Sequence, residues 1–151
     1  MKELTQTAAE IQISYIPKMT LANKISCSED AYKVLKEFYP QETISLQERF
    51  VVAYLNRAHH VIGVYVASVG GLTGTIADPR LILGTGLKVV ASSLILAHNH
   101  PSGNLKASTT DFEITKRLVE AGKLMDISVL DHIIVTSEDG NYLSMADNGL
   151  I

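Results

Sequence analysis

The sequence predicts a single β-sheet with helices on its faces, in the α/β or α+β class. Two observations predict this class: β-branched and aromatic runs alternate with segments of helical periodicity, and no internal repeat occurs. The chain has 151 residues, 46% of them hydrophobic, which is enough for one domain with a substantial core. Its 10 glycines and 4 prolines are too few for a disordered or low-complexity protein.

A strand and a helix are expected first. Residues 11–16 (IQISYI) alternate apolar and polar side chains, which predicts a half-buried strand that ends at Pro17. A helix is expected to begin with Ser28 as its N-cap and to stop before Pro40. The apolar face of this helix would consist of Ala31, Val34, Leu35 and Phe38.

A hairpin and a second helix follow. Residues 50–55 and 61–68 are rich in β-branched and aromatic side chains, and the short polar segment between them predicts a β-hairpin. A glycine-rich connection then leads to a helix over 81–92. Gly84 and Gly86 weaken the helical pattern there.

The last third of the chain repeats the alternation of strand and helix. The apolar run 94–97 is typical of a strand buried on both faces. A helix is expected over about 108–124, a second buried strand over 127–136, and a short strand at 142–144. The apolar face of the helix would consist of Ile114, Leu118, Ala121 and Met125.

Charge and cysteine content indicate where the protein works. The formal net charge is −3 and the basic residues are scattered, which disfavours nucleic acid as a partner without excluding it. No apolar run approaches the roughly 18–20 residues that span a bilayer, and the first residues lack the apolar stretch of a secretory signal. The single cysteine, Cys27, has no partner for an internal disulfide. We therefore expect a cytoplasmic protein with no membrane-bound segment.

The segment from His98 to Asp111 (HNHPSGNLKASTTD) carries the chemistry. His98 and His100 are two residues apart at the end of a predicted strand, so their imidazoles should leave the same face. Asp111 lies in the first turn of the next helix, and a strand end and the following helix start meet at one edge of a sheet. Two imidazoles and one carboxylate are three zinc ligands, with a fourth position left for water. Such a metal lowers the pKa of its water to about 7.

Alternatives exist for the acidic residues. Ser108 and Asp111 also fit a capping box, which is compatible with metal binding because it would hold the carboxylate in place. A metal-dependent hydrolase needs a general base as well. Glu48 opens a predicted strand and is the best-placed upstream acid, but spacing alone does not distinguish it from Glu42 or Glu37.

The string His98-x-His100-Pro101, followed by Ser108-x-x-Asp111, resembles the JAMM motif of the MPN/JAB metalloprotease superfamily. The longer string HNHPSG, with LDHIIV downstream, is similar to the RadC branch (UPF0758) over roughly residues 45–150. The resemblance implies a mixed sheet flanked by helices, JAB/MPN-like and related to the cytidine deaminase fold. It also implies a JAMM core over 45–151, preceded by a strand-and-helix extension over 1–44.

The same resemblance implies roles for the site residues. His98, His100 and Asp111 would hold one zinc ion, and Glu48 would hold and deprotonate the water. Ser108 would donate a hydrogen bond near the developing oxyanion. The expected activity is hydrolysis of a peptide or isopeptide bond in an unidentified protein or peptide substrate.

A role with DNA is the alternative. The name of the RadC family comes from an association with DNA repair, and longer members carry a helix-hairpin-helix region, whereas residues 1–44 predict a strand and a helix. The alternatives are therefore a binding or scaffold domain for DNA or DNA-repair proteins, and a metal-dependent nuclease. An exposed edge strand would accept either a peptide or a second copy of the chain, so a homo-oligomer is a further alternative.

Two residues have two interpretations each. His132 lies beside Asp131 in a predicted buried strand, and it is either a paired core histidine or a residue that supports a metal ligand. Arg80 is either part of a surface ion pair or a contact for a substrate carboxylate.

Overall fold

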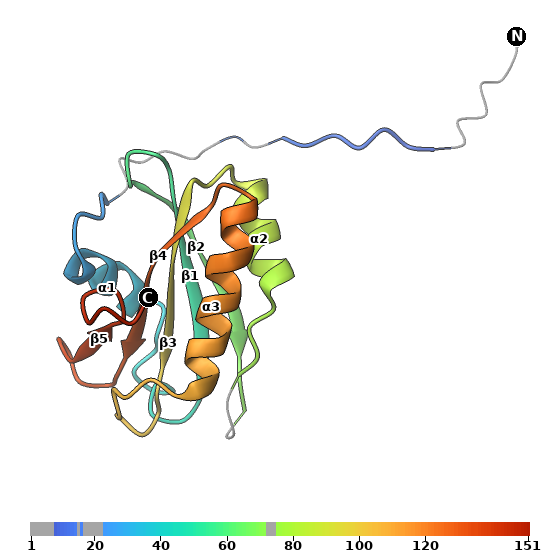
Figure 1. Cartoon of the computed structure of the whole chain (residues 1–151). Coiled ribbons are helices and arrows are strands. Elements are labelled where there is room, and N and C mark those ends of the chain that lie inside the picture. Colours follow the sequence, from blue (N-terminus) through green and yellow to red (C-terminus); the bar gives the residue numbers. More distant parts are fainter. Residues whose placement is uncertain (1–7, 15, 17–22, 72–74) are drawn as a thin grey trace, which may run out of the picture.

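The computed structural model describes residues 8–14, 16, 23–71 and 75–151. These residues form an α/β structure with a mixed sheet flanked by helices, which confirms the predicted fold class (Figure 1). In chain order the elements are α1 (Ser28–Lys36), β1 (Arg49–Leu55), β2 (Val61–Val69), α2 (Pro79–Lys88), β3 (Ser93–Asn99), α3 (Thr109–Leu124), β4 (Ser128–Val135) and β5 (Tyr142–Ser144).

The strands form one sheet in the order β2-β1-β3-β4-β5. β1 and β2 are the predicted antiparallel hairpin, and β1 also pairs antiparallel with β3, with Phe50 opposite His98. β3 and β4 are parallel and are joined by α3, whereas β5 pairs antiparallel with β4. The carboxyl ends of β3 and β4 therefore lie at the same edge of the sheet, where β1 begins.

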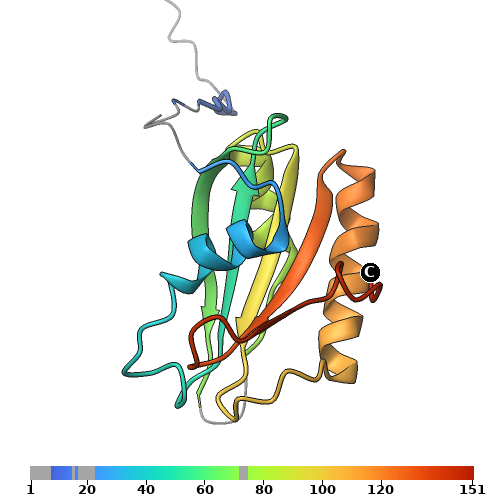
Figure 2. The ribbon, with the colours of Figure 1, turned by 90° about the vertical axis from the view of Figure 1, so that its left-hand side faces the viewer.

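Helices cover both faces of the sheet. α1 packs on one face, and α2 and α3 pack on the other (Figures 1 and 2). Along β1, Val51 and Ala53 face α1, while Val52 and Tyr54 face α2 and α3. Because both faces of β1 and β3 are covered, these strands are buried almost throughout, as their continuous apolar runs predict.

The starts of two helices follow from their capping residues. At α2 the Asp78 carboxylate accepts the Arg80 N–H at 2.9 Å, and Pro79 occupies the first turn, where a missing N–H costs nothing. α3 begins with the predicted capping box of Ser108 and Asp111. Among the described residues, no helix is both long and apolar enough to cross a bilayer.

The prediction of a strand over residues 11–16 is wrong for those of its residues that the structure describes. Residues 11–14 and Ile16 are exposed and form no strand, while Tyr15 and Pro17 lie outside the described residues. Alternation of apolar and polar side chains stabilises a strand only where a neighbouring strand and a core receive them. The described sheet ends at β2 and β5 without this segment.

Several helix boundaries also differ from the prediction. Ser28 is the first residue of α1 rather than its N-cap, a position that Cys27 takes without a side-chain cap. The helix predicted over 81–92 begins at Pro79 and ends at Lys88, because Val90 has a φ of 55°, which does not continue a right-handed helix. Met125 caps the end of α3 and is 44% exposed, so it does not belong to the buried face.

The turn from α3 into β4 depends on a close approach of two backbone segments. The Ile127 N–H donates to the carbonyl of Gly122 at 2.9 Å. A Cβ atom on Gly122 would lie 2.4 Å from the backbone oxygen of Ile127, closer than any real contact. A side chain at Gly122 would therefore separate α3 from β4.

We expect Gly122→Ala to lower the free energy of unfolding by about 2 kcal/mol or more, because backbone rather than a flexible side chain must move. Gly84→Ala is the matched control, since Gly84 lies exposed in α2 with nothing within 4 Å of its added Cβ. That change should raise the free energy of unfolding by about 0.5–1 kcal/mol. Urea denaturation measures both. Equal effects of the two substitutions would contradict the close approach.

Candidate metal centre

The candidate site lies where β3 ends and α3 begins. α3 is the crossover between the parallel strands β3 and β4, so its N-terminus lies beside the carboxyl end of β3. Among the described residues, one group of histidine, cysteine and acidic side chains is compact enough to hold a metal ion. It consists of His98, His100 and Asp111.

The two histidines share one face, as predicted. His98 lies in β3 on the face covered by α3, and its side chain is 1% exposed. His100 follows the strand end, and its N–H donates to the Val135 carbonyl at 3.2 Å, which extends the β3–β4 ladder past β3. The ring centroids of His98 and His100 are 4.7 Å apart.

The three side chains fit a tetrahedral metal ion. Nε2 of His98 lies 2.9 Å from Nε2 of His100 and 3.2 Å from Oδ1 of Asp111. Nε2 of His100 lies 3.4 Å from Oδ2 of Asp111. Zinc ligands at about 2.0–2.1 Å in tetrahedral geometry stand about 3.3 Å apart. The two nitrogen–oxygen separations, each to a different oxygen of Asp111, match this value, while the two Nε2 atoms lie somewhat closer.

The capping box fixes the position of Asp111. Its Oδ2 accepts the Ser108 N–H at 2.7 Å, and its own N–H donates to Oγ of Ser108 at 3.1 Å. Burial by itself raises the pKa of Asp111, but hydrogen bonds from His100 and His98 outweigh burial and hold the pKa well below its usual range. Both sequence interpretations of Asp111 thus apply together: the carboxylate caps α3 and faces the histidines.

Both histidines have partners on their other ring nitrogen. Nδ1 of His100 donates to the Asn104 carbonyl at 2.6 Å, so Nε2 is the ring nitrogen that faces Asp111 and that a metal would bind in place of a proton. Nδ1 of His98 lies 2.7 Å from Nε2 of His132. The Asn104 contact was not predicted, because a main-chain carbonyl has no signature in a sequence.

Glu48 lies beside this group. It directly precedes β1, and extending the β1–β3 register past the strand end places Glu48 opposite His100 on the same face. The two competing acids are elsewhere, since Glu37 ends α1 on the opposite face of the sheet and Glu42 is exposed. Pairing of β1 with β3 therefore separates Glu48 from the alternatives, which spacing did not.

The surroundings of Glu48 change its acidity. Burial raises the pKa of Glu48, and the Asp111 carboxylate raises it further. Nearby His98 and His100 lower the pKa in part, but the net direction is upward. A carboxylate with a raised pKa accepts a proton more readily near neutral pH than a solvated glutamate does.

Asn99 fixes the backbone on both sides of Glu48. Its side chain is fully buried, and its Oδ1 accepts the Arg49 N–H at 2.7 Å. Its Nδ2 donates to the carbonyls of Ile44 at 2.7 Å and Gln47 at 2.8 Å. This role of Asn99 could not be predicted from the sequence, because its partners lie about 50 residues earlier and are all main-chain atoms.

The remaining predicted residues have separate positions. Ser108 is exposed at the N-cap of α3, where its Oγ accepts a backbone N–H, so its hydroxyl hydrogen can still be donated elsewhere. Arg80 forms an exposed ion pair with Asp78 at 2.9 Å. His132 does not pair with the Asp131 carboxylate through its ring; Oδ1 of Asp131 accepts the backbone N–H of His132 instead.

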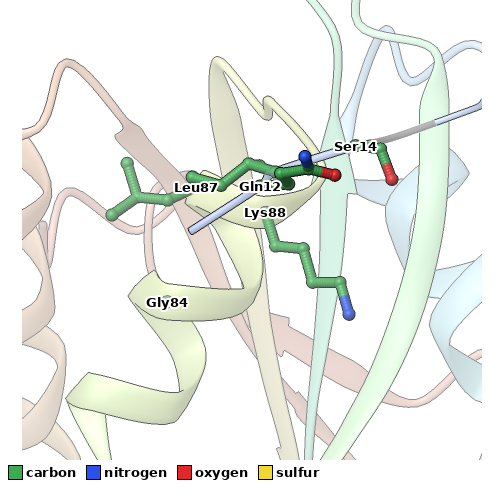
Figure 3. Close-up of a pocket in the computed structure, with 6 residues that line it drawn as sticks. Gln12, Ser14, Gly84, Leu87 and Lys88 are labelled. Carbon is green, nitrogen blue, oxygen red and sulfur yellow. The ribbon is translucent and has the colours of Figure 1, made fainter. Parts of the chain in front are cut away.

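A hollow at the other end of the sheet is separate from this group. It lies between the C-terminal end of α2 and the N-terminal segment (Figure 3). Lys88 is the one charged side chain among its lining residues, which include no histidine or acid. The lining residues are Gln12, Ile13, Ser14, Gly84, Leu87 and Lys88.

The fold and the site define an α/β protein with a candidate metal centre of two histidines and one aspartate. The family model of the RadC-like JAB domain matches residues 25–150. The chain belongs to this family, which confirms the resemblance of its motifs. The match includes α1, and the division into an extension over 1–44 and a core over 45–151 stays a prediction.

Curated relatives extend beyond the matched region. A UPF0758 protein of Flavobacterium johnsoniae is 40% identical over 127 residues, which cover 84% of this chain and 53% of the relative. A UPF0758 protein of Syntrophomonas wolfei is 39% identical over 147 residues, covering 97% of this chain and 62% of the relative. The chain thus spans between half and two thirds of the length of these relatives, whose names state no activity.

We expect Asn99→Asp to lower the free energy of unfolding by about 2–3 kcal/mol. The substitution keeps the acceptor for the Arg49 N–H but turns a carboxyl oxygen toward the carbonyls of Ile44 and Gln47, leaving buried acceptors without donors. Asn148→Asp is the control, because Nδ2 of Asn148 also donates to a main-chain carbonyl, that of Ser144 at 2.7 Å, but from an exposed residue. Urea denaturation at neutral pH compares the two, and a loss at Asn99 no larger than at Asn148 would contradict this account of the buried amide.

Proposed function

We propose that the protein is a zinc-dependent hydrolase that cleaves a peptide or isopeptide bond. The observation that carries the proposal is the convergence of His98, His100 and Asp111 on one point, with Glu48 on the same face of the sheet. Membership of the RadC-like JAB family supports the assignment of this group as a JAMM-type site.

The metal would be held by Nε2 of His98, Nε2 of His100 and one carboxylate oxygen of Asp111. When bound, a divalent metal such as zinc supplies a Lewis acid and makes water acidic enough to react at neutral pH. The donor set of two imidazoles and one carboxylate suits zinc, and three protein ligands leave one position free.

Glu48 would move the proton. Its carboxylate, with a pKa raised by burial, would accept a proton from the attacking water. Protonated Glu48 would then return this proton to the nitrogen of the departing amine. One group can do both because its raised pKa brings its two protonation states closer in free energy near neutral pH.

Ser108 would stabilise the developing oxyanion. Its Oγ is held at the N-cap of α3 by the Asp111 N–H, and the hydroxyl hydrogen remains to be donated toward the substrate carbonyl oxygen. The N-terminus of α3 adds a favourable dipole for negative charge at the same place.

An extended peptide is the substrate shape that the sheet favours. β2 is an edge strand. Its outer side is paired at its start, where the Val61 N–H donates to the Asn23 carbonyl at 3.1 Å. Its other end lies beside Glu48, where the Gly70 N–H donates to the Glu48 carbonyl at 2.7 Å. A peptide that paired with β2 would therefore lead toward Glu48. We place this activity in the cytoplasm, and a second copy of the chain on β2 is the competing occupant.

Binding to DNA or to DNA-repair proteins is the competing function, either as a scaffold or as a metal-dependent nuclease. The net charge of −3 gives it no particular support. Plasmid and single-stranded oligonucleotide tested with the zinc-loaded protein distinguish it from the hydrolase, because metal-dependent nicking would replace the peptidase proposal.

We expect the purified protein to hold close to one zinc per chain, either as isolated or after reconstitution, as measured by elemental analysis. Asp111→Asn should weaken zinc binding by at least about 100-fold, because it removes a charged ligand while its amide oxygen can still cap α3. Glu113→Gln, on the same helix but exposed, is the matched control and should bind zinc normally. A wild-type protein that holds no divalent metal after reconstitution would refute the proposed function.

Glu48→Gln should lower the rate of peptide hydrolysis by about 100-fold or more, because the amide cannot take up the proton, while zinc content stays at the wild-type level. Glu42→Gln, at an exposed position, should change neither. A casein-derived peptide mixture and a peptide branched through a lysine side chain serve as probes, with products identified by mass spectrometry. Wild-type turnover in Glu48→Gln would remove Glu48 from the mechanism.

A further inference from the structure

We propose that His132 and Thr115 are positioning residues that hold His98 with its proton on Nδ1, so that Nε2 is available to a metal. The proposal rests on the proposed metal centre. It concerns a row of buried contacts that runs from the backbone of Asp111 through Thr115 and His132 to the ring of His98.

The direction of the hydrogen bonds follows from one end of the row. Oγ1 of Thr115 lies 2.6 Å from the carbonyl oxygen of Asp111, which can only accept. The single hydroxyl hydrogen of Thr115 is therefore donated to Asp111. Because Nδ1 of His132 lies 2.5 Å from the same Oγ1, the hydrogen between them must belong to His132.

The position of the hydrogen between His132 and His98, at the other end of the row, is then determined. His132 is fully buried, and its ring contacts no carboxylate of the described residues, so it is held as a neutral imidazole with one donor and one acceptor. With Nδ1 as the donor, Nε2 of His132 is the acceptor, and it lies 2.7 Å from Nδ1 of His98. The hydrogen on that contact belongs to His98. Nε2 of His98, which faces His100 and Asp111, is then the ring nitrogen that a metal would bind in place of a proton.

The surroundings leave these rings no room to rearrange. Thr115 and His132 are fully buried, and they come from α3 and β4. The Phe50 ring lies parallel to the His98 ring, with 6.2 Å between their centroids, and edge-on to the His132 ring, with 5.5 Å between their centroids. Rotation of either imidazole would break packing as well as hydrogen bonds, so the row is fixed before a metal arrives.

The two ligand histidines are supported unequally. His100 donates to the carbonyl of Asn104, which lies on an exposed loop. His98 donates into the buried core through His132. The row also joins two ligands, because it starts on the backbone of Asp111 and ends on the ring of His98. Loss of the Thr115 hydroxyl as an acceptor should therefore weaken metal binding, even though Thr115 would contact neither the metal nor the substrate.

The first test is the ring state of His132, measured by long-range ¹H–¹⁵N spectra of the ¹⁵N-labelled full chain, metal-free and zinc-loaded. We expect a neutral ring with the hydrogen on Nδ1 in both. This tautomer follows from the hydrogen bonds of the row, so the zinc affinity measured in the second test is the readout that separates a positioning role from a purely structural one. A hydrogen on Nε2 of His132 would overturn the proposal, and this measurement needs no variant and no substrate.

The second test measures zinc affinity by competition with a chelator. Thr115→Val keeps the shape but removes the acceptor, and should weaken zinc binding about 10–100-fold and shift the ring signals of His132. Thr115→Ser restores the hydroxyl and should bind zinc within about threefold of wild type. Thr110→Val, at an exposed position five residues earlier in α3, should bind zinc like wild type.

The outcomes separate this proposal from the proposed function. Zinc bound normally by both wild type and Thr115→Val would overturn the positioning role and leave the metal centre intact. If Thr115→Val does not fold, the tautomer of His132 in wild type and the affinity of Thr115→Ser decide. A wild type that binds no metal, with the hydrogen found on Nδ1 of His132, would refute the metal centre and with it the purpose assigned to the pair.

Discussion

The site depends most on the carboxylate of Asp111, which serves the helix and the histidines at once. Oδ2 accepts the Ser108 N–H at 2.7 Å, and the same carboxylate contacts Nε2 of both histidines. The start of α3 stabilises a negative charge through its free N–H groups and dipole. The folding energy of the helix therefore orders a ligand in advance, and metal binding need not pay for ordering it.

The end of β3 sends polar side chains to both faces of the sheet. His98 points toward α3, and the adjacent Asn99 points toward the face that α1 covers, as the alternation of a strand requires. His98 contributes to the metal position, while Asn99 holds the backbone before and after Glu48. Since one strand locates both, the separation of ligand and acid is set by the sheet and not by loops. The side chains of His98 and Asn99 both have hydrogen-bond partners, so the cost of removing them from water is compensated.

Short sequence patterns predicted the part of the site that comes from one continuous segment of the chain, residues 98–111. The apolar run 94–97 and the capping box at Ser108 predicted the strand end and helix start that bring His98, His100 and Asp111 together. Spacing could not single out Glu48, because its position depends on the pairing of β1 with β3, which lie far apart along the chain. The family resemblance supplied what the pattern lacked.

Other features could not be predicted from the sequence for physical reasons. The support of His98 needs α3 to place Thr115 beside β4, and such a contact has no local pattern. Asn99 and His100 bind main-chain carbonyls, which every residue offers. At residues 11–16 the sequence instead predicted an element that does not form. The alternating pattern of a strand is present there, but the described sheet has no strand that pairs with it.

The support of Glu48 also ties α1 physically to the sheet. Asn99 donates to the carbonyl of Ile44, which lies ahead of the segment that resembles the JAMM core, and Ile44 is buried in the same cluster as Leu35 of α1. Nζ of Lys36 at the end of α1 donates to the Thr136 carbonyl just after β4 at 2.5 Å. Cutting the chain near residue 44 would expose this cluster and release one end of the segment that positions Glu48. Packing therefore gives a reason for the family match to begin at residue 25, before α1.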